Sequence, residues 1–249
     1  MKKPETKLQE LVHRLQAASG DNLVSVVLYG SAAREEFHEQ YSDVNVLAIF
    51  RELGSGPLSA ITPVVRWWSH EERFTPPLTM TVDELSESAD VFAIELLDIQ
   101  RTHKTLFGED VVSAVQVPMN LHRVEVEHEL RTTLLRLRQH RLLSPDKDDE
   151  LRLVLAKSMS SVITLFRHAL ITVGKSPADG KPKLLEQAGE VFGVDVRPLQ
   201  AILELRTNPQ HPVSISEAYG ACMSAIGRVA HELDTHMPKR HLQKTSHPE

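Results

Sequence analysis

Apolar and polar residues follow a mixed pattern over the first 115 positions of this chain. Two short, almost continuously apolar runs, 23–30 and 43–50, predict buried strands, and 76–82 predicts a third strand after two prolines. Stretches with helical spacing lie before and between these runs. Segment 90–99 is equally compatible with a strand and a helix, and 106–110 predicts a turn. Strands interleaved with helices favour an α/β or α+β domain over 1–115.

The pattern changes to purely helical from about residue 120 to residue 237. Apolar residues between Leu151 and Leu170 recur at steps of three and four, which predicts one long amphipathic helix. Shorter helices are expected at 184–192, 198–205 and 216–233, so that 120–237 forms an all-α helical domain. The last segment, 238–249, lacks a core pattern and is predicted to be a flexible tail.

Composition narrows the class of protein. The net charge is −6 and no basic stripe is present, so nucleic acid is an unlikely partner. No run approaches the ~18 apolar residues of a membrane span, and residues 1–15 are too polar for a secretory signal. The single cysteine, Cys222, is expected to be a core residue in a reducing compartment, and we expect a cytoplasmic protein. Thirteen histidines are present, but no zinc-binding pattern is among them.

Candidate chemistry is concentrated in residues 28–50. A strand that ends at Gly30 and turns into a helix at Ser31 presents free backbone N–H groups, which suit a phosphate. Residues two apart on a strand point to the same face, so Asp43 and Asn45 are expected to lie side by side. Oxygen ligands at these two positions would favour Mg²⁺ or Mn²⁺ bound to the phosphates of a nucleotide.

These residues resemble a known family. Gly30-Ser31-Ala32-Ala33-Arg34 followed by Ser42-Asp43-Val44-Asn45-Val46-Leu47 is similar to the signature of the nucleotidyltransferase superfamily of DNA polymerase β type. The helical half is similar, by helix order alone, to the C-terminal domains of kanamycin and minimal nucleotidyltransferases. The resemblance implies an α+β fold, with a small mixed sheet and flanking helices followed by a helical bundle.

The resemblance also implies a reaction: transfer of a nucleoside monophosphate from a nucleoside triphosphate, with Mg²⁺, to a hydroxyl of a small molecule or protein. By the same resemblance, Gly30, Ser31 and Arg34 would contact the triphosphate, and Lys157 of the long helix could reach it. A solvated helix face explains Lys157 equally well. Asp43 would bind the metal.

The sequence departs from the family at Asn45, where the second metal-binding aspartate is expected. An amide offers a carbonyl oxygen but no charge, so metal binding should be weaker. Glu35 also replaces the glycine that usually follows the arginine. The third carboxylate is open among Glu95, Asp98 and the pair at 83–84, of which we favour Glu95 as the group that activates the acceptor hydroxyl.

Two hypotheses therefore follow. The chain is a nucleotidyltransferase whose catalytic residues are Asp43, Asn45 and Glu95, with Asp43 and Asn45 as metal ligands. Alternatively, it is a catalytically impaired nucleotide-binding or protein-interaction module of the same fold, and its helical half serves docking or a homodimer.

Overall fold

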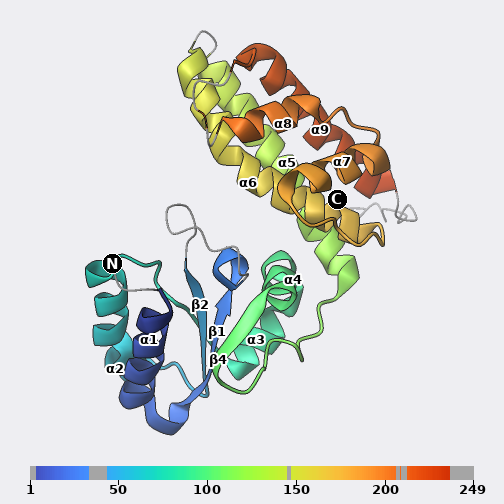
Figure 1. Cartoon of the computed structure of the whole chain (residues 1–249). Helices are drawn as coiled ribbons and strands as arrows, with labels where there is room; N and C mark the ends of the chain where they lie inside the picture. Colours follow the sequence, from blue (N-terminus) through green and yellow to red (C-terminus); the bar gives the residue numbers. More distant parts are fainter. Residues whose placement is uncertain (1–3, 34–43, 145–146, 206–207, 209–211, 236–249) are drawn as a thin grey trace, which may run out of the picture. The chain divides into compact units, whose positions relative to one another are not determined.

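The computed structural model describes residues 4–33, 44–144, 147–205, 208 and 212–235. The chain divides into two compact units, 1–118 and 119–249, and each is described here by itself. Figure 1 shows a sheet with flanking helices in the first unit and helices in the second. The predicted tail, 238–249, lies outside the described residues.

The first unit is built on a four-stranded mixed sheet with the strand order β3-β2-β1-β4. Its strands are β1 (Leu23–Tyr29), β2 (Asn45–Phe50), β3 (Leu78–Thr81) and β4 (His103–Gly108). Strand β1 is antiparallel to β2 and β4, whereas β2 and β3 are parallel. The three predicted strands are confirmed, but β2 begins at Asn45, two residues after the predicted start, and Asp43 lies outside the described residues. The turn predicted at 106–110 is wrong, because most of it belongs to β4, which pairs with β1.

Gly108 explains that error. Its φ is +75°, and a side chain there would lie 1.9 Å from the carbonyl oxygen of Val24 on β1. Glycine is therefore required for the close approach of the two strands, where the sequence pattern predicted a turn.

Helices cover both faces of the sheet. Helices α1 (Pro4–Ser19) and α2 (Ser55–Arg66) pack on one face, against Val46, Ala48 and Phe50. Helices α3 (Val82–Glu87) and α4 (Ala93–Arg101) pack on the other, against Leu47 and Ile49. The central strands are apolar on both sides for this reason, which is why their sequences lack strict alternation.

Segment 90–99, which the sequence left open, is mostly helical. Helix α4 begins at Ala93, and its residues Ala93, Leu96 and Ile99 are buried. Their spacing of three places them on one side of the helix, and Leu96 and Ile99 pack on the sheet. The carboxylate of Glu95 therefore projects from a helix and not from a strand.

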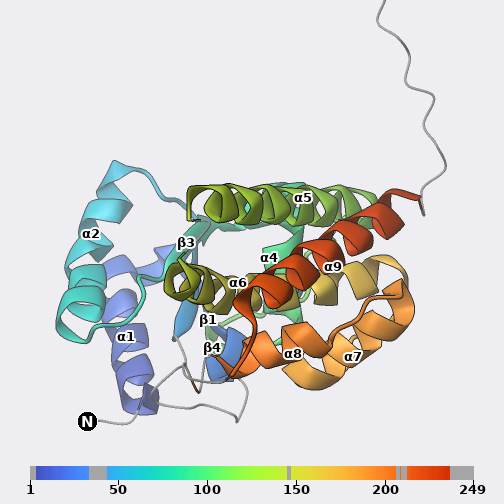
Figure 2. The ribbon, with the colours of Figure 1, turned by 90° about the horizontal axis from the view of Figure 1, so that it is seen from above.

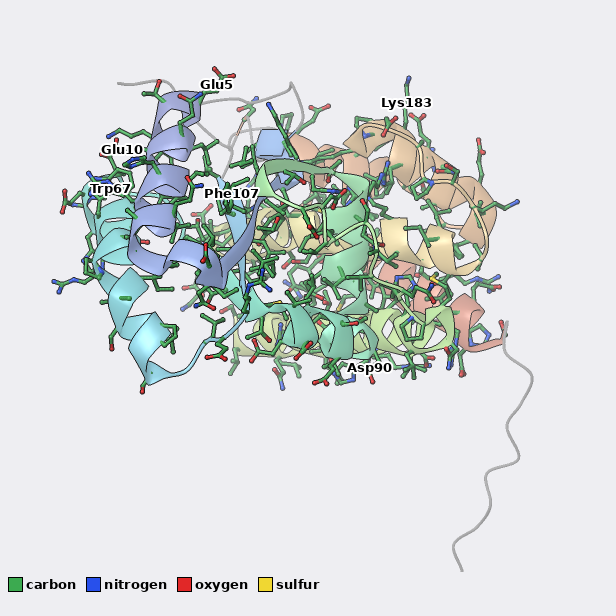
Figure 3. All side chains as sticks on the ribbon, turned by 90° about the horizontal axis from the view of Figure 1, so that it is seen from below. Glu5, Glu10, Trp67, Asp90, Phe107 and Lys183 are labelled. Carbon is green, nitrogen blue, oxygen red and sulfur yellow. The ribbon has the colours of Figure 1, made fainter. Side chains whose placement is uncertain are left out.

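Packing on the outer side of α1 involves Trp67 from the π-helical turn Trp67–Glu71. The guanidinium of Arg14 lies 4.0 Å from the ring centroid of Trp67, and Lys7 contacts the same ring. Lys7 also bridges Glu10 and Glu72, and Figure 3 labels Glu10 and Trp67 on this side of the unit. These contacts fix α1 to the segment that follows α2.

The second unit consists of helices in its described part. They are α5 (Met119–Leu143), α6 (Asp148–Thr172), α7 (Lys181–Phe192), α8 (Arg197–Glu204) and α9 (Ile215–Thr235). Figure 2 shows α5, α6 and α9 packed side by side, in agreement with their contacts. The Tyr219 hydroxyl of α9 donates a hydrogen bond of 2.8 Å to the Leu137 carbonyl of α5. Cys222 is fully buried, as predicted, and burial raises the pKa of its thiol to about 12.

Helix α6 is the core of this unit. The predicted stripe is confirmed, since Leu151, Leu155, Met159, Phe166 and Leu170 are all buried. By length and composition alone α6 is also apolar enough to cross a membrane, and half of its most apolar window is buried. Because its neighbours α5, α7, α8 and α9 pack around it, we interpret α6 as the central helix of a bundle.

Candidate active site

The predicted site lies where β1 ends. Tyr29, the last residue of β1, is directly opposite Asn45, the first residue of β2. A four-residue 3₁₀ turn, η2 (Gly30–Ala33), follows Tyr29. Antiparallel pairing therefore brings the glycine turn and position 45 together although they are fifteen residues apart in sequence.

Gly30 is held in a conformation that favours glycine. Its φ is +77°, and its N–H donates a hydrogen bond of 3.0 Å to the carbonyl of Thr102. A Cβ built on Gly30 would lie 3.3 Å from Nδ2 of Asn45, which is tighter than an ordinary contact. Because its own N–H is occupied by Thr102, Gly30 contributes space beside Asn45 and not a donor for a ligand.

Glu95 lies on the same side of the sheet. Tyr29 packs against the α3/α4 core, and strand alternation places Asn45 on the face of Leu47 and Ile49, which belong to that core. Glu95 is exposed in the first turn of α4. The pKa of Tyr29 is raised above its ordinary value. Burial is the larger cause, and the charge of the Glu95 carboxylate is the smaller one. The tyrosine hydroxyl therefore stays protonated, within the electrostatic range of Glu95.

The other candidate carboxylates differ in their surroundings. Glu84 accepts a hydrogen bond of 2.8 Å from the backbone N–H of Thr81 and completes a capping box at the start of α3. Asp83 is exposed in the first turn of the same helix. Asp98 is half-buried, one turn after Glu95 on α4. Glu95 is the one of these carboxylates that acts on Tyr29, and therefore it remains our favoured candidate.

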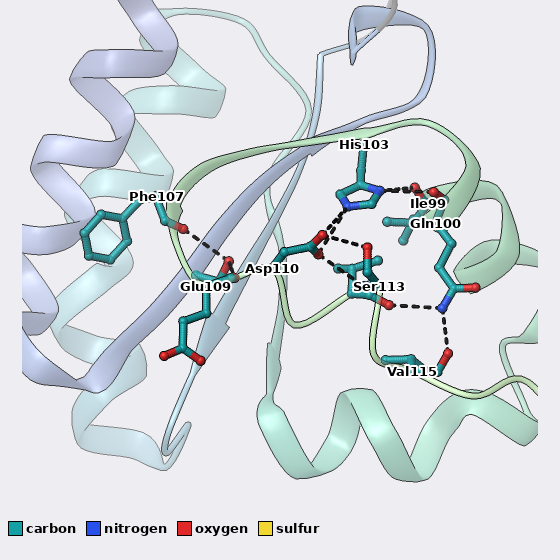
Figure 4. A network of polar contacts seen from close by, with 10 residues as sticks. Ile99, Gln100, His103, Phe107, Glu109, Asp110, Ser113 and Val115 are labelled. Carbon is teal, nitrogen blue, oxygen red and sulfur yellow. Dashed lines mark hydrogen bonds and ion pairs between the residues drawn. The ribbon is translucent and has the colours of Figure 1, made fainter.

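A polar network holds the C-terminal end of α4 against β4 (Figure 4). His103, the first residue of β4, is opposite Tyr29 on β1. Its Nδ1 lies 3.1 Å from the carbonyls of Ile99 and Gln100, and its Nε2 lies 3.2 Å from both carboxylate oxygens of Asp110. Each ring nitrogen therefore faces oxygen atoms, the two carbonyls on one side and the carboxylate on the other.

Asp110 is held in place by a second partner. The Ser113 hydroxyl donates a hydrogen bond of 2.6 Å to its carboxylate. This bond is the largest cause that lowers the pKa of Asp110 to about 2, and the Ser113 N–H and His103 add to it. The network fixes the end of α4, and with it the helix that carries Glu95. Neither Tyr29 nor this network was singled out from the sequence, because no spacing motif links residues that only strand pairing brings together.

Other predicted site residues are only partly placed. Arg34 and Asp43 lie outside the described residues, as does the side chain of Ser31. Lys157 is exposed on α6, in the second unit.

The described residues of the site include few side chains that could bind a metal ion. Within the described ranges, no three His, Cys, Asp or Glu side chains gather into a metal-binding group. Asn45 adds one neutral oxygen, and Asp43, two residues before it, would add the charge that a divalent cation needs. Asn45 is thus the one predicted metal ligand that the described residues include.

Comparison with known proteins identifies the fold. No protein-family profile matches the sequence, and no curated protein is significantly similar to it. The structure is similar to the crystal structure of spectinomycin adenyltransferase AAD(9) from Enterococcus faecialis with ATP and spectinomycin, with a TM-score of 0.55. The match covers 91% of this chain and 99% of that chain, at 14% sequence identity. The chain has a nucleotidyltransferase fold.

This finding confirms, at the level of the fold, the resemblance recognised in residues 30–34 and 42–47. It also confirms the predicted fold class, an α+β unit with a small mixed sheet followed by an all-α region. A match over 91% of the chain includes both units, so the helical half is part of the likeness as well. At 14% identity the comparison shows the fold, and the roles of single residues must be argued from the site itself.

Proposed function

We propose that this protein binds a nucleoside triphosphate beside Gly30 and Asn45 and transfers a nucleoside monophosphate to a hydroxyl of a small molecule. The observation that carries the proposal is that Tyr29, Gly30, Asn45 and Glu95 are gathered at one end of β1 in a nucleotidyltransferase fold. The neighbour in structure was solved with ATP and a small-molecule acceptor, spectinomycin, which supports the substrate class. A hydroxyl on a protein is the alternative acceptor.

The metal end of the site depends on Asp43 and Asn45. By the resemblance to the nucleotidyltransferase signature, Asp43 and the amide oxygen of Asn45 would hold one Mg²⁺ or Mn²⁺. When bound, the cation would neutralise the charge on the phosphates of the triphosphate. The backbone N–H groups after Gly30, the Ser31 hydroxyl and Arg34 would bind the remaining phosphate oxygens.

The acceptor end of the site depends on Glu95 and Tyr29. In the proposed reaction, Glu95 takes the proton of the acceptor hydroxyl as that oxygen attacks the α-phosphorus and pyrophosphate leaves. Tyr29, whose raised pKa keeps its hydroxyl protonated, would donate a hydrogen bond in the same space and orient the acceptor or Glu95.

Asn45 supports a second candidate, a nucleotide-binding module with impaired catalysis. A unit charge about 4 Å from another is worth about 4 kcal/mol at an effective dielectric constant of about 20, and twice that beside a divalent ion. Desolvation of the carboxylate offsets part of this energy. Asn45→Asp should still lower the Mg²⁺ concentration needed for nucleotide binding by about 10-fold or more.

Four proteins separate these candidates: the native chain, Asp43→Ala, Asn45→Asp and the control Asp21→Ala. Asp21 lies before the first residue of β1, at the opposite end of the strand from Gly30, so its loss should leave the site intact. Calorimetric titration with non-hydrolysable triphosphates, with and without Mg²⁺ or Mn²⁺, measures binding without an acceptor. Pyrophosphate release with spectinomycin and other hydroxylated small molecules then measures transfer.

Metal-dependent nucleotide binding that Asp43→Ala removes and Asp21→Ala preserves is the result that we expect. Transfer by the native chain supports the enzyme, and transfer by Asn45→Asp alone supports the impaired module. If neither the native chain nor Asn45→Asp binds any triphosphate, both candidates are wrong.

A further inference from the structure

The turn that joins α4 to β4 holds the glycine turn of the candidate site. The carbonyl of Thr102 accepts the hydrogen bond of 3.0 Å from the Gly30 N–H. This bond lies one residue beyond the last pair of the β1/β4 ladder, in which Tyr29 is opposite His103. The ends of a ladder open more readily than its centre. The position of the Thr102 carbonyl therefore depends on how its own turn is held.

Gln100 attaches this turn to the segment that follows β4. Its Nε2 donates hydrogen bonds of 3.0 and 2.7 Å to the carbonyls of Val112 and Val115 (Figure 4). Both carbonyls belong to segment 109–115, which is neither helix nor strand. These side-chain bonds therefore satisfy backbone groups that secondary structure leaves open. Val112 is also fully buried in the α3/α4 core, which keeps the segment against the end of α4.

His103 makes a second attachment on the other side of Thr102. Its ring lies between the last carbonyls of α4 and the carboxylate of Asp110, which belongs to the same segment, 109–115. Gln100 and His103 therefore connect both sides of Thr102 to this segment. A displacement of the segment would move the turn, and with it the carbonyl that holds the glycine turn.

We propose that Gln100 and His103 are positioning residues of the candidate active site. They hold the Thr102 carbonyl in the place from which it fixes Gly30. The orientation of Gly30 sets the direction of the backbone N–H groups that follow it, which are the groups assigned to the triphosphate. Loss of either attachment should therefore weaken triphosphate binding, although it removes no group that contacts the ligand. This effect on binding rests on the proposed function, whereas the effect on the glycine turn does not.

Amide hydrogen exchange, measured by NMR on the full chain, tests the effect on the glycine turn. It compares the native chain with Gln100→Leu and His103→Leu, each of which removes one attachment. Both positions are half-buried, so a leucine suits their surroundings. The exchange rate of the Gly30 amide reports its bond to Thr102. Calorimetric titration with a non-hydrolysable ATP analogue and Mg²⁺ measures nucleotide binding by the same proteins.

Asn22→Leu is the matched control. Asn22 is a half-buried amide of the same unit, and it lies before the opposite end of β1 from Gly30. Its Nδ2 donates a hydrogen bond of 3.0 Å to the Glu52 carbonyl, and its Oδ1 accepts one of 2.9 Å from the Glu52 N–H. The control therefore removes the same kind of attachment at a distance from the site. Urea unfolding measures the stability that each variant loses, and circular dichroism confirms that each is folded.

We expect exchange at Gly30 to be about 10-fold faster in both turn variants, because each loses hydrogen bonds that hold the turn. The dissociation constant of the ATP analogue should rise by about 5-fold in both, because the site is less preorganised. Asn22→Leu should keep the native exchange rate at Gly30 and the native affinity, even though it lowers the stability of the unit. A residue that merely stabilises the unit would behave like this control.

Three results would overturn the proposal. They are native exchange at Gly30 in the turn variants, equal acceleration by Asn22→Leu, and native affinity for the ATP analogue in both turn variants. If the native chain binds no ATP analogue, the proposed function is wrong, and exchange at Gly30 alone then decides whether the two residues position the turn.

Discussion

Gly30→Ala tests the closeness of the glycine turn to position 45. The substitution puts a side chain on a residue with a φ of +77° and a methyl group 3.3 Å from Nδ2 of Asn45. The left-handed conformation costs a non-glycine residue about 1–2 kcal/mol, and the lower entropy of the unfolded chain returns roughly 0.4–1 kcal/mol. Turning the Asn45 amide away from a preferred rotamer costs about 0.5–1.5 kcal/mol more. We expect a net loss of about 1.5–2 kcal/mol in the free energy of unfolding.

Gly20→Ala is the matched control. Gly20 also has a positive φ, +51°, but a side chain there would meet nothing within 4 Å. It carries the backbone cost without the contact, so we expect a loss of about 1 kcal/mol or less. Adding Asn45→Ala to Gly30→Ala removes the contact and should recover about 0.5–1 kcal/mol, whereas adding it to Gly20→Ala should not.

Tryptophan fluorescence in a urea titration measures these differences. The chain has only two tryptophans, Trp67 and Trp68, and both are buried in the first unit, so the signal reports that unit alone. If Gly30→Ala and Gly20→Ala lose the same stability and Asn45→Ala couples with neither, the contact that defines our candidate site does not exist. If Gly30→Ala is as stable as the native chain, the left-handed backbone is wrong as well.

Two further predictions concern titrating groups. The folded pKa of Asp110, about 2, is below its ordinary 3.8, so its contribution to stability is present above pH 3.8 and is lost as the pH falls toward 2. Ser113→Ala should therefore destabilise the first unit near neutral pH and progressively less in acid, as measured by urea unfolding across that pH range. The exposed control Ser86→Ala should show no such trend. A loss of stability in Ser113→Ala that does not depend on pH would contradict the role of Ser113 in lowering the pKa of Asp110. In the second unit, Cys222 should resist a thiol reagent at pH 8 in the folded protein and react as fast as a free thiol in urea, because it is fully buried and its pKa is about 12. Rapid labelling of the folded chain would show that α9 is not packed as described.

Local pattern was sufficient for much of the fold. Strands β1 and β2 could be predicted because continuous β-branched and apolar runs of this length suit a strand covered on both faces. Helix α6 could be predicted because its apolar residues recur at helical spacing from Leu151 to Leu170, which is about five turns. The turn at Gly30-Ser31 and the following Ser42-Asp43-Val44-Asn45 were sufficient to suggest the nucleotidyltransferase fold.

Strand pairing and packing decided the remainder. Strand β4 carries only a weak alternation, and Gly108, which favours a turn in isolation, is there because the Val24 carbonyl leaves no room for a side chain. Segment 90–99 has the composition of either a strand or a helix, and the contacts of Leu96 and Ile99 with the sheet fix it as α4.

The candidate site was the part of the structure that was hardest to predict from the sequence. Asn45 was found by its motif, but its partner Tyr29 and the orientation of Glu95 depend on the register of β1 against β2 and on how α4 packs. Periodicity is a property of a single segment, so it predicts which face of an element is buried. Periodicity carries no information about which residues of two distant segments come into contact. In this protein the candidate site is formed by such contacts between distant segments.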